Sequence, residues 1–150
     1  MLISCSFSYK KLSKVINMNE LTYRSHSVGQ NAFHFVWKPK YASKFLGYEQ
    51  VNKVCFGSLR MIAAQYKCKI YELQVMPDHI HLFVELPPTI SVSKALQLFK
   101  GISSRILRRR FKFLTKIPMI WSKGKFFRSV GNVSFETIQH YIAESQGARR

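Results

Sequence analysis

Acidic residues are scarce in this 150-residue chain: 7 Asp and Glu stand against 24 Lys and Arg, for a formal net charge of +17. Between Glu85 and Glu136 there are eleven Lys or Arg and no acidic residue. A field of this sign attracts polyanions, and nucleic acid is the first candidate partner. Anionic lipid is the rival. A thermophilic origin would normally add glutamates together with lysines, and glutamates are few here.

Long apolar runs and paired cysteines are also lacking. No run approaches the roughly 20 residues of a membrane span, so no membrane partner beyond peripheral attachment is expected. Cys5, Cys55 and Cys68 share no close spacing, which argues against a disulfide framework and against a cysteine-based zinc site. Cys55 falls on an apolar helical stripe and is expected to be a buried free thiol. These features favour a reducing, cytoplasmic setting.

The N-terminal 22 residues lack the continuous apolar core, about 7–15 residues long, of a secretory signal. We expect residues 1–22 to form a poorly ordered extension, and Met18 is an alternative translation start. The rest of the chain, residues 23–150, is most simply one domain at this length.

The hydrophobic pattern of that domain predicts an α+β fold. Strands are expected at Gln30–Lys38, Lys69–Val75, His79–Leu86 and Trp121–Val130, with helices at Tyr48–Gln65 and from Val92 onward after the N-cap Ser91. The order β-α-β-β-α-β is that of a ferredoxin-like fold, an antiparallel sheet with two helices on one face. A further helix at the C-terminus, capped by Ser134, is added to this plan. RNA-binding modules share the order, so fold alone does not decide function.

Two histidines follow the tight Pro77-Asp78 turn. On a strand, His79 and His81 point to the same face, while Ile80 points to the other. Two adjacent imidazoles can bind one divalent metal ion. The alternative is a pair of ordinary strand residues on a face open to water. A zinc deaminase site would need a Cys-x-x-Cys partner, which is missing, and Mg²⁺ or Mn²⁺ would need oxygen ligands as well.

The last predicted helix carries Tyr141. This side chain is either a core aromatic or a nucleophile that attacks a phosphodiester and holds the DNA end covalently. A phenol with a pKa of about 10 needs a metal or a base to activate such chemistry.

The basic segment from Arg105 through Arg128 also has two interpretations. It is either a solvated charged face or a surface for single-stranded nucleic acid, where phosphates pair with cations and bases stack on aromatic rings. The candidate DNA contacts are Lys100, Arg105, Arg108 and Arg109. The aromatic residues of this segment, some of which must fill the core, are Phe111, Phe113, Trp121, Phe126 and Phe127.

Several ordered motifs together resemble one family. From about Tyr23 to Gln146 the chain is similar to the single-tyrosine HUH transposases (TnpA) of the insertion-sequence 200/605 group, in which HUH denotes His, a hydrophobic residue, His. The motifs that carry the resemblance are Phe33-His34-Phe35-Val36-Trp37-Lys38-Pro39-Lys40-Tyr41, Met76-Pro77-Asp78-His79-Ile80-His81-Leu82-Phe83-Val84, Phe99-Lys100-Gly101-Ile102-Ser103-Ser104-Arg105, Trp121-Ser122, Val130-Gly131-Asn132-Val133-Ser134 and Tyr141-Ile142.

The resemblance implies a chemistry. His79 and His81 would bind a catalytic Mg²⁺ or Mn²⁺, and Tyr141 would attack single-stranded DNA to give a 5′-phosphotyrosine link and a free 3′-OH. The DNA would carry hairpins near the ends of the element, and the protein would act on the nucleoid of a prokaryotic cell. It would work as a homodimer in which the tyrosine helix of one chain can complete the metal site of the other.

One position departs from the family pattern. The family places a metal-binding Gln four residues after the tyrosine, where this chain has Ser145, and Gln146 follows one residue later. A five-residue step turns Gln146 by roughly 140° from Tyr141 around the helix axis. Gln146 would then reach the metal only through a local bulge or an unwound helix end, and with that provision it is the candidate third ligand. Glu144 is an alternative, and an inactive copy with a weakened site is the third possibility.

Other functions fit parts of this pattern. A decayed or domesticated transposase, or an RNA-binding module, would bind nucleic acid without catalysis. The RNA-binding class would place aromatic residues in a characteristic pattern on the exposed sheet face, and we find no such pattern. Related HUH replication and plasmid-transfer nucleases are generally larger chains.

Overall fold

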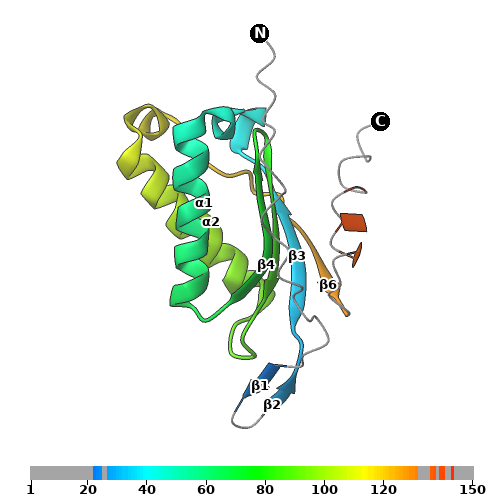
Figure 1. Ribbon diagram of the computed structural model, residues 1–150. Coiled ribbons are helices and arrows are strands. Elements are labelled where there is room, and N and C mark those ends of the chain that lie inside the picture. The colour runs from blue at the N-terminus through cyan, green and yellow to red at the C-terminus, as the bar shows by residue number, and fades with distance from the viewer. Residues whose placement is uncertain (1–21, 25–26, 132–135, 138, 141–142, 144–150) are drawn as a thin grey trace.

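The computed structural model describes residues 22–24, 27–131, 136–137, 139–140 and 143 (Figure 1). The expected N-terminal extension lies outside the described residues except for its last residue, Thr22. Strand β1 (Thr22–Arg24) begins there and pairs antiparallel with β2 (Ser27–Gly29). Sequence reasoning missed this hairpin because strands of three residues are too short to show an alternating pattern.

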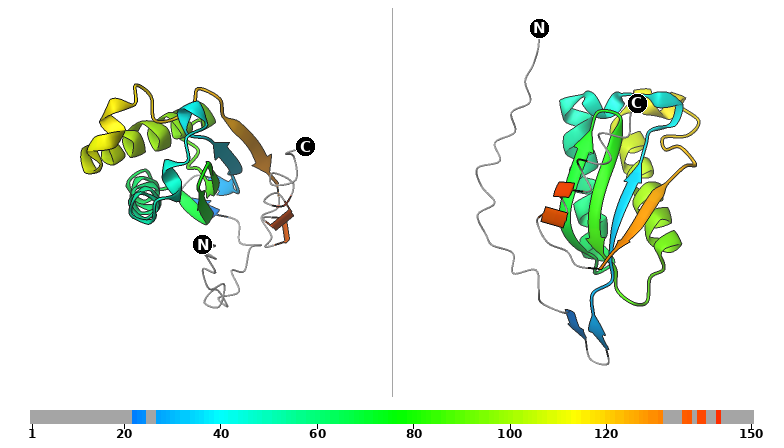
Figure 2. Two further views of the ribbon diagram at one scale, coloured as in Figure 1. Left: turned by 90° about the horizontal axis from the view of Figure 1, so that it is seen from above. Right: turned by 90° about the vertical axis from the view of Figure 1, so that its right-hand side faces the viewer.

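The main sheet contains four strands in the order β4-β5-β3-β6, and every neighbouring pair is antiparallel. Helices α1 and α2 lie together on one face of this sheet (Figures 1 and 2). The chain order β3-α1-β4-β5-α2-β6 confirms the predicted ferredoxin-like fold. The elements are β3 (Ala32–Trp37), α1 (Glu49–Gln65), β4 (Lys69–Met76), β5 (His79–Glu85), α2 (Val92–Arg110) and β6 (Phe126–Val130), with short 3₁₀ turns η1 (Lys40–Ala42), η2 (Phe45–Gly47) and η3 (Lys112–Lys116).

The hydrophobic core fills the space between the sheet and the two helices. Ile80, Leu82 and Val84 of β5 point into it, as the alternation of the strand predicts. The apolar stripes of both helices meet them from the other side. Cys55 of α1 is a buried free thiol, as expected, and burial raises its pKa to about 12.

Helix α2 begins where the sequence predicts. The hydroxyl of Ser91 accepts a hydrogen bond from the backbone N–H of Lys94 at 3.2 Å, which satisfies one of the otherwise unpaired donors of the first turn. The helix continues to Arg110, and its last three residues are all arginines. Cations at this end interact favourably with the helix dipole.

The last strand is shorter than predicted. Trp121 does not begin it but forms an isolated bridge with Pro39, and β6 starts only at Phe126. The indole N–H of Trp121 donates to the Ser103 hydroxyl of α2 at 3.1 Å, and the ring packs edge-on against Trp37. Because this contact anchors Trp121 beside α2 in the core, the chain joins the sheet edge only five residues later.

In the part of the chain that the structure describes, no helix combines the length and the apolar character that a membrane crossing requires.

Removal of a core side chain of β5 should destabilise the domain strongly. Leu82 is fully buried, so Leu82→Ala should lower the free energy of unfolding by about 2–5 kcal/mol. Met61 on α1 is half-exposed, and Met61→Ala should change the free energy by less than about 0.5 kcal/mol. Urea unfolding followed by circular dichroism measures both. Equal effects of the two substitutions would contradict the assigned core.

Candidate functional site

Strand β5 is buried on both of its faces. Its even-numbered residues face the helices, and His79, His81, Phe83 and Glu85 face the other way, yet all seven residues of the strand are buried. The exposed fractions of His79 and His81 are 8% and 0%. The face that carries these histidines is therefore not open to water, and the two rings lie in a shielded environment.

The two histidine rings are close neighbours. Their centroids are 4.7 Å apart and their planes are nearly perpendicular. His79 Nδ1 is 2.6 Å from an oxygen of the Asp78 carboxylate. Carboxylates that hold one nitrogen of a histidine orient the ring and direct its other nitrogen toward a metal. For His79, the nitrogen able to bind a metal is therefore Nε2.

A third histidine, on the neighbouring strand, contacts the pair. Strand β3 pairs with β5 so that His34 lies opposite Phe83 and Val36 lies opposite His81. His34 Nε2 is 3.1 Å from His81 Nδ1, and the His34 ring stacks on Phe83 at 4.1 Å. Sequence reasoning missed His34. The alternation within Phe33-His34-Phe35 signalled only that its side chain leaves the core face, and the strand register was needed to bring it to His81.

Burial keeps two of these histidines, His34 and His81, neutral. The pKa of His34 is lowered to about 3, mainly by desolvation and to a smaller extent by the neighbouring His81 and Arg128. Desolvation, followed by His79, lowers the pKa of His81 to about 4. An imidazole binds a metal in its neutral form, so His81 has the protonation state of a ligand at neutral pH.

The far end of β5 carries a separate polar cluster. The Tyr71 hydroxyl donates to the Glu85 carboxylate at 2.6 Å and accepts from the Gln30 amide at 3.2 Å. Burial, followed by the hydrogen bond to Glu85, raises the pKa of Tyr71 to about 12. Glu85 shares the face of the two histidines, but Tyr71 holds its carboxylate.

The described residues supply only part of a metal site. No group of three or more His, Cys, Asp or Glu within them is arranged to hold an ion. The predicted nucleophile Tyr141, and the candidate third ligands Gln146 and Glu144, lie outside the described residues. The described positions nearest to Tyr141, residues 139–140 and 143, are helical. Residues 136–137 and 139–140 lie on the side of the sheet away from α1 and α2 (Figures 1 and 2). His79 and His81 also face away from the helices, because Ile80, Leu82 and Val84 of the same strand point into the core.

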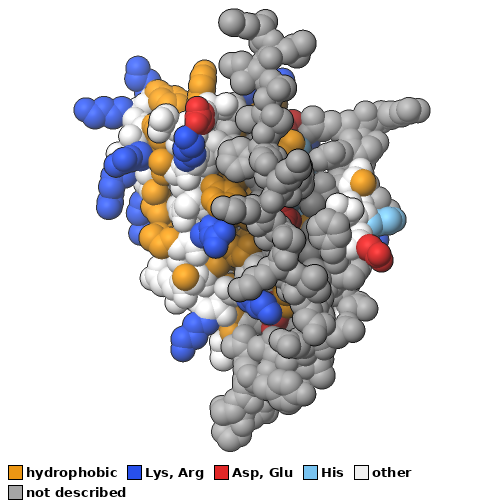
Figure 3. Space-filling model, in the orientation of Figure 1, with side chains coloured by type: hydrophobic (Ala, Val, Ile, Leu, Met, Phe, Trp, Pro, Cys, Tyr) orange, Lys and Arg blue, Asp and Glu red, His pale blue; other side chains and the backbone are white. Residues whose placement is uncertain are grey.

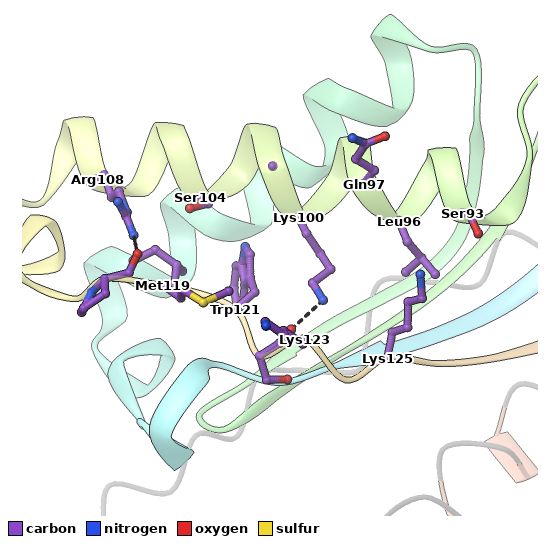
Figure 4. Close-up of a pocket in the computed structure, with 14 residues that line it drawn as sticks. Ser93, Leu96, Gln97, Lys100, Ser104, Arg108, Met119, Trp121, Lys123 and Lys125 are labelled. Atoms are coloured by element: carbon purple, nitrogen blue, oxygen red, sulfur yellow. Dashed lines mark hydrogen bonds between the residues drawn. The ribbon is translucent and has the colours of Figure 1, made fainter.

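The four candidate DNA contacts divide into two kinds. Lys100 donates to the backbone carbonyl of Ser122 at 2.7 Å, and Arg108 donates to the carbonyls of Ile117 and Pro118 at 2.9 and 2.7 Å (Figure 4). These two cations connect the segment after η3 to α2 through hydrogen bonds. Both also line a pocket of about 480 Å³ that lies between this segment and α2. Arg105 and Arg109, in contrast, are exposed.

Exposed cations gather on the helical layer (Figure 3). Those at the C-terminal end of α2 and on η3 are Arg105, Arg109, Arg110, Lys112 and Lys116. The aromatic residues between Arg105 and Arg128 differ in exposure: Trp121 is buried, whereas Phe113, Phe126 and Phe127 are about half-exposed. The exposed rings could stack with bases, and the exposed cations could pair with phosphates.

The buried histidines should make the fold sensitive to acid. Because the folded-state pKa values of His34 and His81 lie below the ordinary 6.5, the unfolded chain binds more protons between about pH 4 and pH 6.5. The free energy of unfolding should therefore fall as the pH falls through this window. Urea unfolding of metal-free protein at about pH 7 and pH 5 measures the loss. The loss should be smaller in His34→Gln, and an equal loss in both proteins would contradict the assignment.

Comparison with known proteins identifies the family. The family model described as "Transposase IS200 like" matches residues 27–145. The transposase of insertion sequence IS200 from Salmonella typhimurium is 31% identical over 121 residues, covering 79% of this chain and 78% of that protein. The ISDra2 transposase TnpA of Deinococcus radiodurans is 35% identical over 125 residues, covering 79% of this chain and 86% of that protein.

Two solved structures share the fold. A candidate transposase from Deinococcus radiodurans R1 superposes with a TM-score of 0.67 at 27% identity, covering 83% of this chain and 97% of the other. A REP-associated tyrosine transposase bound to a REP hairpin gives a TM-score of 0.56 at 14% identity, covering 85% and 74% of the two chains. The family model spans both the histidine strand and the segment that contains Tyr141. The chain belongs to the IS200-like transposase family.

Proposed function

We propose that this transposase cleaves and rejoins single-stranded DNA at the ends of its element, with Tyr141 as the nucleophile and a divalent metal ion, Mg²⁺ or Mn²⁺, bound by His79 and His81. The observation that carries the proposal is the arrangement of the histidine pair. Both rings are buried side by side on one sheet face, and each has its Nδ1 engaged, by Asp78 and by His34. A histidine that binds a metal through Nε2 usually has its Nδ1 held by a hydrogen bond in this way.

The donor set fits such an ion. The two imidazoles would supply nitrogen ligands, and a hard divalent ion takes its remaining ligands from oxygen donors, including those of the substrate phosphate. When bound, the ion would withdraw charge from the phosphate oxygens and so stabilise the transition state of phosphoryl transfer. We propose Gln146 as the protein oxygen ligand, because Ser145 occupies the position that the family reserves for glutamine.

The reaction is a transesterification that needs no external oxidant or energy source. The Tyr141 phenolate oxygen forms a bond to the scissile phosphorus, and the bond from phosphorus to the 3′-oxygen breaks. The departing 3′-oxygen takes up a proton and becomes a free 3′-OH, while the 5′ end stays linked to Tyr141. A 3′-OH from another strand can then attack this link, which rejoins DNA and releases the tyrosine.

The proposed DNA partner carries hairpins. Support comes from the structural neighbour that is bound to a REP hairpin, and from the net charge of +17 of this chain. We propose that Arg105 and Arg109 contact the phosphates directly. Lys100 and Arg108 add to the positive field, but their side chains also hold the backbone of the segment after η3.

A covalent adduct tests the catalytic proposal. Purified protein, Mn²⁺ and an oligonucleotide carrying a palindrome that flanks the gene should give a protein–DNA band that survives denaturing electrophoresis. Tyr141→Phe should abolish the band and His81→Ala should reduce it at least about 100-fold, because each removes a participant in the chemistry. Neither substitution should weaken DNA binding in a gel-shift assay by more than about twofold.

Tyr48→Phe is the matched control, because Tyr48 is an exposed tyrosine on the helical side and should be dispensable. DNA binding by the native protein without an adduct, at any metal concentration, would overturn the catalytic proposal. That result would favour a non-catalytic DNA-binding protein. Such a protein is the alternative suggested by Ser145, which stands where the family has its metal-binding glutamine.

We further propose that the protein acts as a homodimer. Mixing His81→Ala with Tyr141→Phe locates the nucleophile. Recovery of the adduct in the mixture means that Tyr141 of one chain serves the histidines of the other. No recovery in verified mixed dimers means that each site uses its own tyrosine.

The third ligand has its own test. Gln146→Ala should weaken Mn²⁺ binding about tenfold if the Gln146 amide oxygen ligates the ion. Glu144→Gln is the control, because it should leave the affinity within about twofold. Isothermal titration with Mn²⁺ alone measures both. A larger effect at Glu144 would transfer the ligand role to that carboxylate.

A further inference from the structure

We infer that His34 is a positioning residue of the metal site: its Nε2 accepts a hydrogen bond from His81 Nδ1 and thereby turns His81 Nε2 toward the metal. The inference rests on the proposed metal site at His79 and His81. It adds His34, a residue of β3, to the residues that form the metal site, and it assigns the direction of the hydrogen bond between His34 and His81.

The contact itself is short and buried. His34 Nε2 and His81 Nδ1 are 3.1 Å apart, within ordinary hydrogen-bond distance, and both side chains are almost fully shielded, with exposed fractions of 1% and 0%. One of the two nitrogens must carry the shared proton. A neutral His81 that ligates through Nε2 has its proton on Nδ1, so His34 Nε2 must be the acceptor.

Packing holds His34 in place for this role. Its ring lies parallel to Phe83, with 4.1 Å between centroids and 5° between planes, and the edge of Phe126 closes another side. The strand register places Phe83 directly opposite His34 and sets His81 two residue pairs along, on the same face of the sheet. A ring stacked in this way cannot swing away from His81 without breaking the stack.

The two metal-binding histidines are thus oriented by different chemistry. Asp78, the residue before His79, supplies a carboxylate to His79 Nδ1. His34, 47 residues before His81 in the chain, supplies an imidazole to His81 Nδ1. Local sequence can arrange the first contact, but only the pairing of β3 with β5 can arrange the second.

The direct test is the tautomer of His81 in metal-free protein. Long-range ¹⁵N–¹H NMR of labelled wild-type protein should show His81 with its proton on Nδ1. Finding the proton on Nε2 would overturn the inference, because His81 would then accept from His34. This readout needs no variant and no activity.

Substitutions supply the energetic test. His34→Leu removes the acceptor and should weaken Mn²⁺ binding about 10–100-fold, the usual range for loss of such a contact. His34→Gln carries an amide at the position of Nε2 and should recover most of the affinity. The control Phe35→Leu alters the same strand on the core face, so it should lower stability without changing the affinity for Mn²⁺. Wild-type affinity and an unchanged tautomer in folded His34→Leu would also overturn the inference.

The same titrations separate this inference from the proposed function. If wild-type protein binds no Mn²⁺, or His81→Ala binds it as well as the wild type, the proposed metal site fails. If binding depends on His79 and His81 but not on His34, only the positioning role fails.

Discussion

The pairing of β3 with β5 is the constraint on which the rest of the site depends. This pair divides the side chains of β5 between two environments: Ile80, Leu82 and Val84 meet the helices, and the histidines meet the opposite side. A shift of one residue in this register would send the histidines into the core and the aliphatic residues out of it. The hydrophobic effect therefore fixes which face of β5 carries the polar cluster, because a slip of one residue would expose the core face of the strand.

Much of this arrangement can be predicted from the sequence. Alternation along His79–Glu85 predicts which side chains share a face, and the apolar stripes together with the Ser91 cap predict both helices. Contacts between elements distant in sequence cannot be predicted in this way. His34 and Trp121 each look like residues of an aromatic strand, and only tertiary packing shows that one meets His81 and the other meets Ser103.

The predicted nucleophile and third ligand, Tyr141 and Gln146, stay predictions. Motif spacing and family membership support Tyr141, whereas Gln146 stands one residue beyond the position at which the family has its glutamine. The histidine pair nevertheless indicates which kind of ligand atom the metal still needs. Two imidazoles provide nitrogen ligands only, so a hard metal at this site depends on oxygen donors from the last helix or from the substrate.

Positive charge lies on both faces of the sheet. Exposed cations gather on the helical layer (Figure 3). On the other face, the exposed Arg128 of β6 lies directly opposite His34, and its charge contributes to the lowered pKa of His34.

Lys100 and Arg108 show a further consequence of how the charge is arranged. Both donate to backbone carbonyls and are partly shielded, whereas Arg105 and Arg109 stand in solvent. Dissolved ions screen exposed charges more than shielded ones. Rising ionic strength would therefore release DNA from the protein long before it loosened the segment joining α2 to β6. The transposase could leave its substrate as an intact, folded molecule, ready to bind again when the salt concentration falls.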